Sequence, residues 1–152
     1  MVDAGGSGAH GLYHEAIVAA ARRASGVGHL AAADASVSVD NPLCGDRVSV
    51  DVRVEGGRLS GIAHRRGCLL CEAAASIMAA NAVGESAEDL ARVADALGEA
   101  LAEGFTDRRL AWRDLEVFAP VTGHRSRHRC VTLAFEALAA AMADAVAGGE
   151  DV

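Results

Sequence analysis

The sequence contains no lysine and very few aromatic residues. All 14 basic residues are arginine, and only five of the 152 residues are Phe, Trp or Tyr. The absence of lysine excludes mechanisms that need one, such as Schiff-base formation or phosphate binding by a P-loop. With 21 acidic residues the formal net charge is −7, whereas a general nucleic-acid-binding surface needs a basic face with stacking aromatics. We therefore expect no nucleic-acid partner.

Long hydrophobic runs are also missing. The most apolar stretch, Val131 to Ala147, consists mainly of alanine and is interrupted by Glu136 and Asp144, so we expect no membrane span. The first nine residues are rich in Gly, Ala and Ser and lack the positive patch and apolar block of a secretory signal. These two features together favour a cytoplasmic location.

Hydrophobic periodicity predicts a single domain over residues 10–147, with a flexible tail at 1–9 and a frayed end at 148–152. Alternation with a period of two predicts strands over 35–40, 48–55 and 58–64, with a tight turn at Gly56-Gly57. Helical periodicity predicts helices over 10–24, 69–81, 86–104 and from residue 127 or 130 onward. The segment 105–122 is predicted as a short helix or an extended piece. The expected fold class is α+β, a small antiparallel three-stranded sheet with helices packed on one face.

The four cysteines carry most of the chemical information. In a cytosolic chain they favour metal binding or thiol reactivity over disulfides. Cys44 lies in a polar loop two residues before Asp46, Cys68 stands where a strand gives way to a helix, and Cys130 lies near the start of the last helix. Thiols at the ends of elements are favoured as thiolates by backbone N–H groups and the helix dipole.

Two kinds of metal site fit this residue set. Three thiolates and one carboxylate can form a tetrahedral zinc site, and three thiolates with a spare position also suit an iron–sulfur cluster. Cys71 follows Cys68 in a CxxC pair. Because Cys71 lies in an apolar helical segment, it is interpreted first as a small buried hydrophobe and second as an accessory ligand.

Three ordered segments carry a family resemblance. Asn41 to Asp46 reads NPLCGD, Gly67-Cys68 opens a helix rich in Ala and Ser, and Arg127 to Leu133 reads RHRCVTL. These segments resemble the motifs of the U-type iron–sulfur cluster assembly proteins, the family of IscU, SufU and the N-terminal domain of NifU. The match is collinear from about Leu12 to Leu138. The 61 residues between Cys68 and Cys130, with an arginine three before the last cysteine, resemble the SufU subfamily most.

The resemblance implies a zinc site made of Cys44, Asp46, Cys68 and Cys130, with Cys44 as the acceptor of persulfide sulfur. It also implies a cysteine desulfurase of the SufS type as partner, and a downstream cluster scaffold or apo-proteins as sulfur or cluster recipients. This would make the chain a sulfur-transfer or scaffold protein rather than a free-standing catalyst. The alternative is an IscU-like scaffold that holds iron or a [2Fe–2S] cluster. A second alternative is a structural zinc-binding adaptor.

Several further residues near the cysteines are accessory candidates. The resemblance places Arg127 in the SufU pattern, and His128 is close enough in sequence to Cys130 to be a spare ligand. Six of the 14 arginines lie near a motif cysteine. Their guanidinium groups either form a solvated rim or lower the pKa of the neighbouring thiols. The six are Arg47, Arg65, Arg66, Arg125, Arg127 and Arg129.

Overall fold

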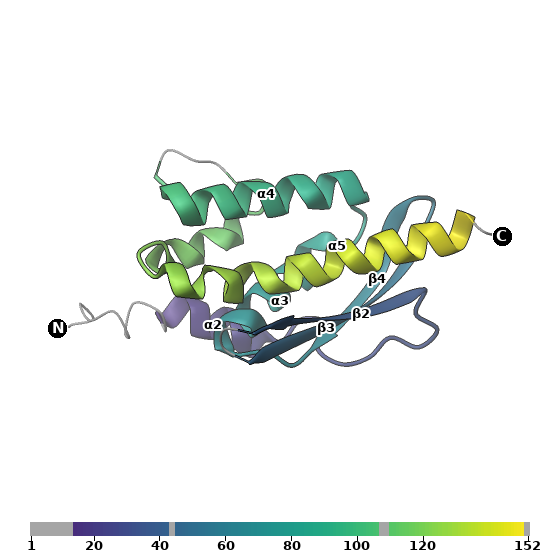
Figure 1. Ribbon diagram of the computed structural model, residues 1–152, viewed down its shortest axis with the longest axis horizontal. Helices are drawn as coiled ribbons and strands as arrows, with labels where there is room; N and C mark the ends of the chain where they lie inside the picture. The colour runs from purple at the N-terminus through teal and green to yellow at the C-terminus, as the bar shows by residue number, and fades with distance from the viewer. Residues whose placement is uncertain (1–13, 43–44, 107–109, 151–152) are drawn as a thin grey trace.

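The computed structural model describes residues 14–42, 45–106 and 110–150, and Figure 1 shows how their helices and strands are arranged. The element order confirms the expected α+β class, with strands near the start followed by helices. The elements are α2 (Glu15–Arg23), β2 (Ala35–Asn41), β3 (Asp46–Glu55), β4 (Arg58–Arg65), α3 (Leu69–Ala82), α4 (Ala87–Glu103), the 3-10 helices η1 (Arg113–Val121) and η2 (Arg125–Arg127), and α5 (His128–Glu150).

The three strands form an antiparallel sheet in the order β2-β3-β4. Val48, Val50 and Val52 alternate along β3 and are fully buried on one face. Gly56 and Gly57 connect β3 to β4 with φ angles of 59° and 78°, as the tight turn requires. The predicted meander is therefore confirmed, and each strand extends one or two residues beyond its expected range.

The long helices cover the valine face of the sheet. Figure 1 shows α5 running across the strands, α3 behind it and α4 as an outer layer. The other views agree, and the contacts between α5 and both β2 and β3 are among the most extensive in the fold. α2 packs beside α3. Ser86 caps α4, because its hydroxyl accepts a hydrogen bond from the Asp89 N–H at 3.2 Å.

The opposite face of the sheet is partly covered rather than fully exposed to solvent. The connection between α2 and β2 reaches this face at Leu30, which lies against the Asp51 carboxylate. Asp51 is only 3% exposed on this face. Its carboxylate accepts hydrogen bonds from Ser36 Oγ at 2.7 Å and Leu30 N–H at 3.1 Å, and it pairs with Arg65 Nη1 at 3.1 Å. Burial alone would raise the pKa of Asp51, but these partners hold the pKa below its ordinary value.

The short helix that the sequence allows within 105–122 is confirmed as a nine-residue 3-10 helix with Pro120 inside it. The end of the chain differs from the sequence-based expectation. The last helix continues through Gly148 to Glu150, where the sequence predicts fraying. Each glycine costs about 1 kcal/mol of helix propensity, and a helix already held by tertiary packing can absorb that cost. The expected tail at 1–9 lies outside the described residues.

α5 also explains the apolar composition near the C-terminus. The 23 residues from Arg125 to Ala147 are long and apolar enough, by length and composition alone, to cross a membrane. However, 56% of the apolar window is buried inside the protein. Its packing against the sheet, α3 and α4 accounts for the composition as that of a core helix.

Replacing Asp51 with alanine tests the covered face. We expect Asp51→Ala to lower the free energy of unfolding by about 2 kcal/mol or more at pH 7, because three hydrogen-bond donors lose a charged acceptor. Since the folded pKa lies below the unfolded value of about 3.9, this contribution is present above that pH and is lost as pH falls through the folded pKa. Urea unfolding at pH 7 and in the acid range measures both effects.

Asp40→Ala is the matched control for that experiment. Asp40 pairs with Arg47 at 2.7 Å, but both side chains are more than half exposed, so its loss should change stability much less. Equal effects of the two substitutions at pH 7 would show that the buried carboxylate has no special role.

Candidate metal centre

Four candidate residues meet where separate elements begin. Asp46 is the first residue of β3, Cys68 is the residue that precedes α3, and Cys71 lies in the first turn of that helix. Cys130 lies in the first turn of α5. The strand β2 ends at Asn41, which pairs with Asp46. The antiparallel register and the packing of α5 on the sheet therefore bring residues 84 positions apart in sequence into contact.

The Asp46 carboxylate is the common neighbour of the thiols. Its Oδ2 atom lies 3.8 Å from Cys71 Sγ and 3.9 Å from Cys130 Sγ, and the two sulfurs of Cys68 and Cys71 are 3.5 Å apart. One ligand atom each from Asp46, Cys68 and Cys71 lies within 4.8 Å of the others. Cys130 contacts this group at Asp46 Oδ2, 3.9 Å from its Sγ atom.

These distances suit a small tetrahedral ion. A zinc ion with Zn–S near roughly 2.3 Å and Zn–O near roughly 2.0 Å separates its ligand atoms by about 3.5 to 3.8 Å. The separations of 3.5 Å between Cys68 Sγ and Cys71 Sγ and of 3.8 Å between Cys71 Sγ and Asp46 Oδ2 are close to these values. Soft sulfur donors with one carboxylate are also the donor types that zinc and iron prefer. Asp46, Cys68 and Cys71 could therefore hold a metal ion, and this group shares Asp46 and Cys68 with the ligand set that the resemblance implies.

Cys44, the predicted sulfur acceptor and metal ligand, lies outside the described residues. Described residues on the two sides of it are joined by a hydrogen bond, from the Gly45 N–H to the Asn41 carbonyl at 2.8 Å. Gly45 has a φ of 74°, which glycine adopts without strain. The chain therefore enters and leaves this segment beside Asp46. The role of Cys44 stays a prediction.

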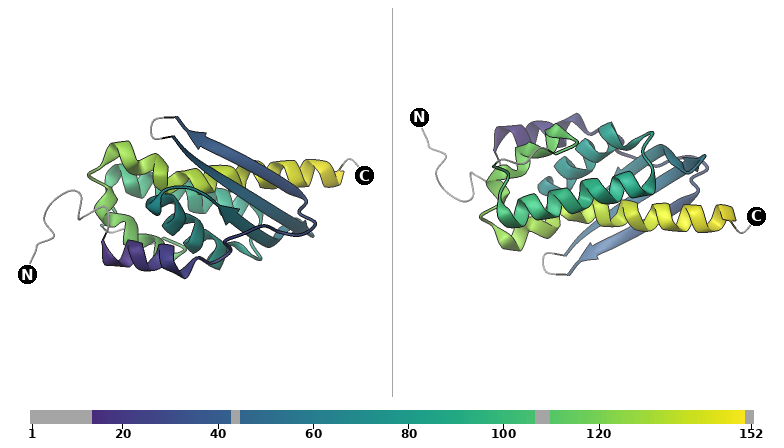
Figure 2. Two further views of the ribbon diagram at one scale, coloured as in Figure 1. Left: turned by 90° about the horizontal axis from the view of Figure 1, so that it is seen from below. Right: turned by 90° about the horizontal axis from the view of Figure 1, so that it is seen from above.

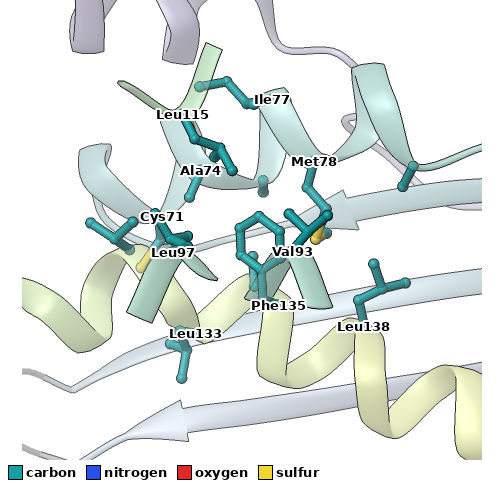
Figure 3. Close-up of a cluster of buried hydrophobic side chains, with 14 of the residues drawn as sticks. Cys71, Ala74, Ile77, Met78, Val93, Leu97, Leu115, Leu133, Phe135 and Leu138 are labelled. Atoms are coloured by element: carbon teal, nitrogen blue, oxygen red, sulfur yellow. The ribbon is translucent and has the colours of Figure 1, made fainter. Parts of the chain in front are cut away.

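Cys71 has two sets of neighbours. It is fully buried, and Figure 3 shows it in the apolar cluster that α3 shares with Leu97 of α4 and Leu133 of α5. That placement agrees with the first interpretation, a small buried hydrophobe. Its sulfur also contacts Cys68 and Asp46, so the structure adds Cys71 to the candidate ligands that the resemblance named.

Asn41 is a site residue that the sequence reasoning did not single out. It is 0% exposed, and its Nδ2 donates toward Cys130 Sγ at 4.0 Å. The signal was present in the alternation of β2. Val37, Val39 and Asn41 share the inward face, so a polar side chain occupies a position where the pattern demands an apolar one. Such a residue is expected to have a specific partner.

Gly67 makes room for the cysteine pair. Its φ of 105° lies in the region that favours glycine, and a Cβ at this position would lie 2.5 Å from the Cβ of Cys71. A side chain at residue 67 would therefore push α3 away from β3, where Val48 lies on the other side at 3.2 Å. The Gly-Cys pair of the second motif thus has a steric basis.

Cys68 and Cys71 share a proton across their contact. The hydrogen bond with Cys71 lowers the pKa of Cys68 to about 7, although partial burial and the Asp46 carboxylate oppose that shift. The same hydrogen bond raises the pKa of Cys71, and burial of its thiol raises it further. Cys68 is therefore the more readily ionised thiol of the pair.

The accessory candidates mostly have other partners. Three of the six arginines pair with carboxylates: Arg47 with Asp40, Arg65 with Asp51 and Arg129 with Glu136. His128 Nε2 lies 3.1 Å from the Val121 carbonyl and 3.0 Å from that of Thr122. This places the ring against the end of η1 and outside the mutual group of Asp46, Cys68 and Cys71. Arg127 ends η2, directly before α5.

Substituting Gly67 tests the steric argument. We expect Gly67→Ala to destabilise the fold by about 1 to 3 kcal/mol from the crowding of Cys71, in addition to about 1 kcal/mol for the unfavourable φ. Gly84→Ala is the matched control, since Gly84 has a φ of 97° and nothing within 4 Å of an added Cβ. Chemical denaturation measures both, and equal losses would contradict the crowding.

The pKa of Cys68 predicts its alkylation profile. In metal-free protein, Cys68 should react with iodoacetamide at a rate that is half-maximal near pH 7, and Cys71 should react only at higher pH. Mass spectrometry of the tryptic peptide 67–92 locates the label by fragmentation. Cys71→Ala removes the hydrogen bond that is the main cause of the low Cys68 pKa. The pH of half-maximal Cys68 alkylation should therefore move toward or above about 8.5. An unchanged profile in that variant would contradict the shared proton.

Comparison with known proteins places this arrangement in a family. Residues 12–147 match the model of the NifU-like N terminal domain. The IscU iron–sulfur cluster assembly scaffold protein of Streptococcus pyogenes serotype M1 is 30% identical over 104 residues. That match covers 68% of this chain and 65% of the relative, so the chain spans just under two thirds of its length.

Solved structures agree with the family match. The N-terminal part of a nitrogen-fixing NifU-like protein from Brucella abortus superposes with a TM-score of 0.84 at 30% identity, covering 93% of this chain and 99% of that one. A SUF-system iron–sulfur cluster assembly scaffold from Fervidobacterium islandicum superposes with a TM-score of 0.74, covering 88% and 98%. At 18% identity this second likeness concerns the fold alone. Since the family model covers nearly the whole chain, the chain belongs to the NifU-like N-terminal domain family.

Proposed function

We propose that this chain acts in iron–sulfur cluster assembly as a zinc-binding protein that accepts persulfide sulfur from a cysteine desulfurase of the SufS type. The observation that carries the proposal is the convergence of Cys71 and Cys130 on the Asp46 carboxylate at 3.8 and 3.9 Å, with Cys68 Sγ 3.5 Å from Cys71 Sγ. Family membership supports the pathway, because the S. pyogenes relative is named an iron–sulfur cluster assembly scaffold. The proposed location is the cytoplasm.

The proposed ligands are Asp46, Cys68, Cys130 and, by resemblance, Cys44, with Cys71 as a further donor. A bound zinc ion would keep its cysteine ligands deprotonated at neutral pH. Asp46 is the one hard donor among soft ones and the easiest to exchange. The buried Asn41 amide, 4.0 Å from Cys130 Sγ, would orient that thiol toward the site.

Sulfur acceptance requires an attacking thiolate. The thiolate displaces the desulfurase cysteine from the outer sulfur of its persulfide, so that one S–S bond breaks and another forms, and the desulfurase leaves with its own thiolate. By resemblance the acceptor is Cys44. Among the described cysteines Cys71 and Cys130 are fully buried and Cys68 is half-buried, so only Cys68 offers an approach without opening the core.

Metal analysis combined with desulfurase kinetics tests the proposal. Purified protein should contain about one zinc per chain, and it should stimulate a SufS-type desulfurase. Cys44→Ser and Asp46→Ala should abolish the stimulation, whereas Asp40→Ala, an exposed carboxylate of β2, should retain it. Undiminished stimulation by Asp46→Ala, together with lost stability, would favour the structural adaptor instead.

The second candidate is a scaffold on which a [2Fe–2S] cluster is assembled for downstream recipients. The name of the S. pyogenes relative, a cluster assembly scaffold protein, favours this candidate. Cys44, Cys68 and Cys130 would be ligands and Asp46 the labile fourth, with Cys71 able to replace it at 3.8 Å. Anaerobic reconstitution distinguishes the two. Iron with labile sulfide and visible absorption would overturn the zinc relay, and a colourless zinc protein would support it.

A further inference from the structure

The Cys68–Cys71 pair has the arrangement of a dithiol at a helix start. Cys68 immediately precedes α3, Cys71 is three residues later, and their sulfurs are 3.5 Å apart. This separation is already within van der Waals contact, so a bond between the sulfurs requires only side-chain adjustment. Cys68 is half-buried and Cys71 fully buried. The Cys68 sulfur is therefore the one nearer to solvent, and the Cys71 sulfur lies on the core side of it.

We infer that Cys71 resolves a persulfide on Cys68, releasing the bound sulfur as sulfide and leaving a Cys68–Cys71 disulfide. The inference deepens the proposed function and rests on it, since the persulfide sulfur is what the chain would receive. It assigns a reductive step to the chain itself, because the two thiols supply both electrons. The inorganic sulfur of iron–sulfur clusters is at the oxidation level of sulfide.

The reaction balances with the groups present. In the first step the Cys68 sulfur attacks the outer sulfur of a donor persulfide, and the donor leaves as a thiolate. In the second step the Cys71 sulfur attacks Cys68 Sγ, the bond to the outer sulfur breaks, and that sulfur leaves as HS⁻. The Cys71 proton leaves with the sulfide, because the outer sulfur of the ionised persulfide departs as HS⁻. One sulfane sulfur gains two electrons and the two thiols lose them, and an external dithiol then restores the pair.

The positions of the two sulfurs support this order of events. Displacement at sulfur needs the attacking and leaving atoms on opposite sides of the sulfur that is attacked. Cys71 approaches Cys68 Sγ from the core side, because it packs among the buried residues of α3, α4 and α5. The outer sulfur of a Cys68 persulfide would then project toward the exposed side and can leave. A metal held by the same two sulfurs would exclude the reaction, so it belongs to the metal-free chain.

The tryptic map of this chain makes the test direct. Cleavage after Arg66 and Arg92 yields peptide 67–92, which contains Cys68 and Cys71 and no other cysteine, whereas Cys44 and Cys130 fall on peptides 24–47 and 130–152. Full-length protein, reduced and freed of metal with a chelator, is treated anaerobically with inorganic polysulfide. It is then desalted, alkylated and digested. Wild type should give peptide 67–92 with an internal disulfide, two hydrogen masses below the dithiol.

Two variants at residue 71 make the result specific. Cys71→Ser and Cys71→Ala should each leave a lasting persulfide on Cys68, with loss of that sulfur slowed about tenfold or more because an intramolecular thiol acts at high effective concentration. Ala80→Ser, on the exposed side of the same helix, is the matched control and should behave as wild type. Circular dichroism confirms that each variant is folded.

The outcomes separate this inference from the proposed function. A disulfide that links peptide 67–92 to peptide 24–47 or 130–152, or a persulfide that disappears equally fast from Cys71→Ser, would overturn the role of Cys71. If a SufS-type desulfurase transfers no sulfur to wild type while polysulfide still yields the internal disulfide, the proposed sulfur acceptance fails and the chemistry of the pair stands.

Discussion

Burial of the valine face of the sheet under α5 and α3 is the contact on which the site depends. Val48, Val50 and Val52 are all fully buried there, and each such side chain stabilises the fold by about 1.5 to 3 kcal/mol. The contacts among the thiols and Asp46 are long, at 3.5 to 3.9 Å, and neutral hydrogen bonds contribute only about 1 kcal/mol each. The core therefore positions the thiols and the carboxylate, and the site contributes little to its own assembly.

The shortage of aromatic residues is consistent with this packing. α3 has Ala73, Ala74 and Ala75 in succession, all fully buried, so its backbone can approach the neighbouring elements closely on more than one side. The close approach continues at Gly67, where even a Cβ would collide with Cys71. Larger side chains such as Phe118 and Leu115 are also fully buried. Small residues are thus concentrated on the helix that carries the cysteine pair.

The arginines near the motif cysteines are not the main cause of the low thiol pKa, although their positions in the sequence suggest that role. Arg47, Arg65 and Arg129 are each paired with a carboxylate, which agrees with the solvated-rim interpretation for these three. The low pKa of Cys68 has its main cause in the Cys71 thiol and not in a guanidinium group. A neighbouring thiol lowers that pKa only while it keeps its own proton, so the two cysteines act as a unit. Such coupling makes their substitutions non-additive.

The sequence by itself determined the strands, the glycine turn, most helix limits and the identity of the motif residues, because periodicity and turn chemistry are local properties. It did not determine that Cys71 and Asn41 belong to the site. Cys71 meets Asp46 across 25 positions of sequence, and Asn41 meets Cys130 across 89. Nothing local distinguishes such a cysteine from a buried hydrophobe, and 3-10 geometry around Pro120 has no clear hydrophobic period. Those features were decided by tertiary structure, since only the packing of α3 and α5 on the sheet brings the distant partners within reach.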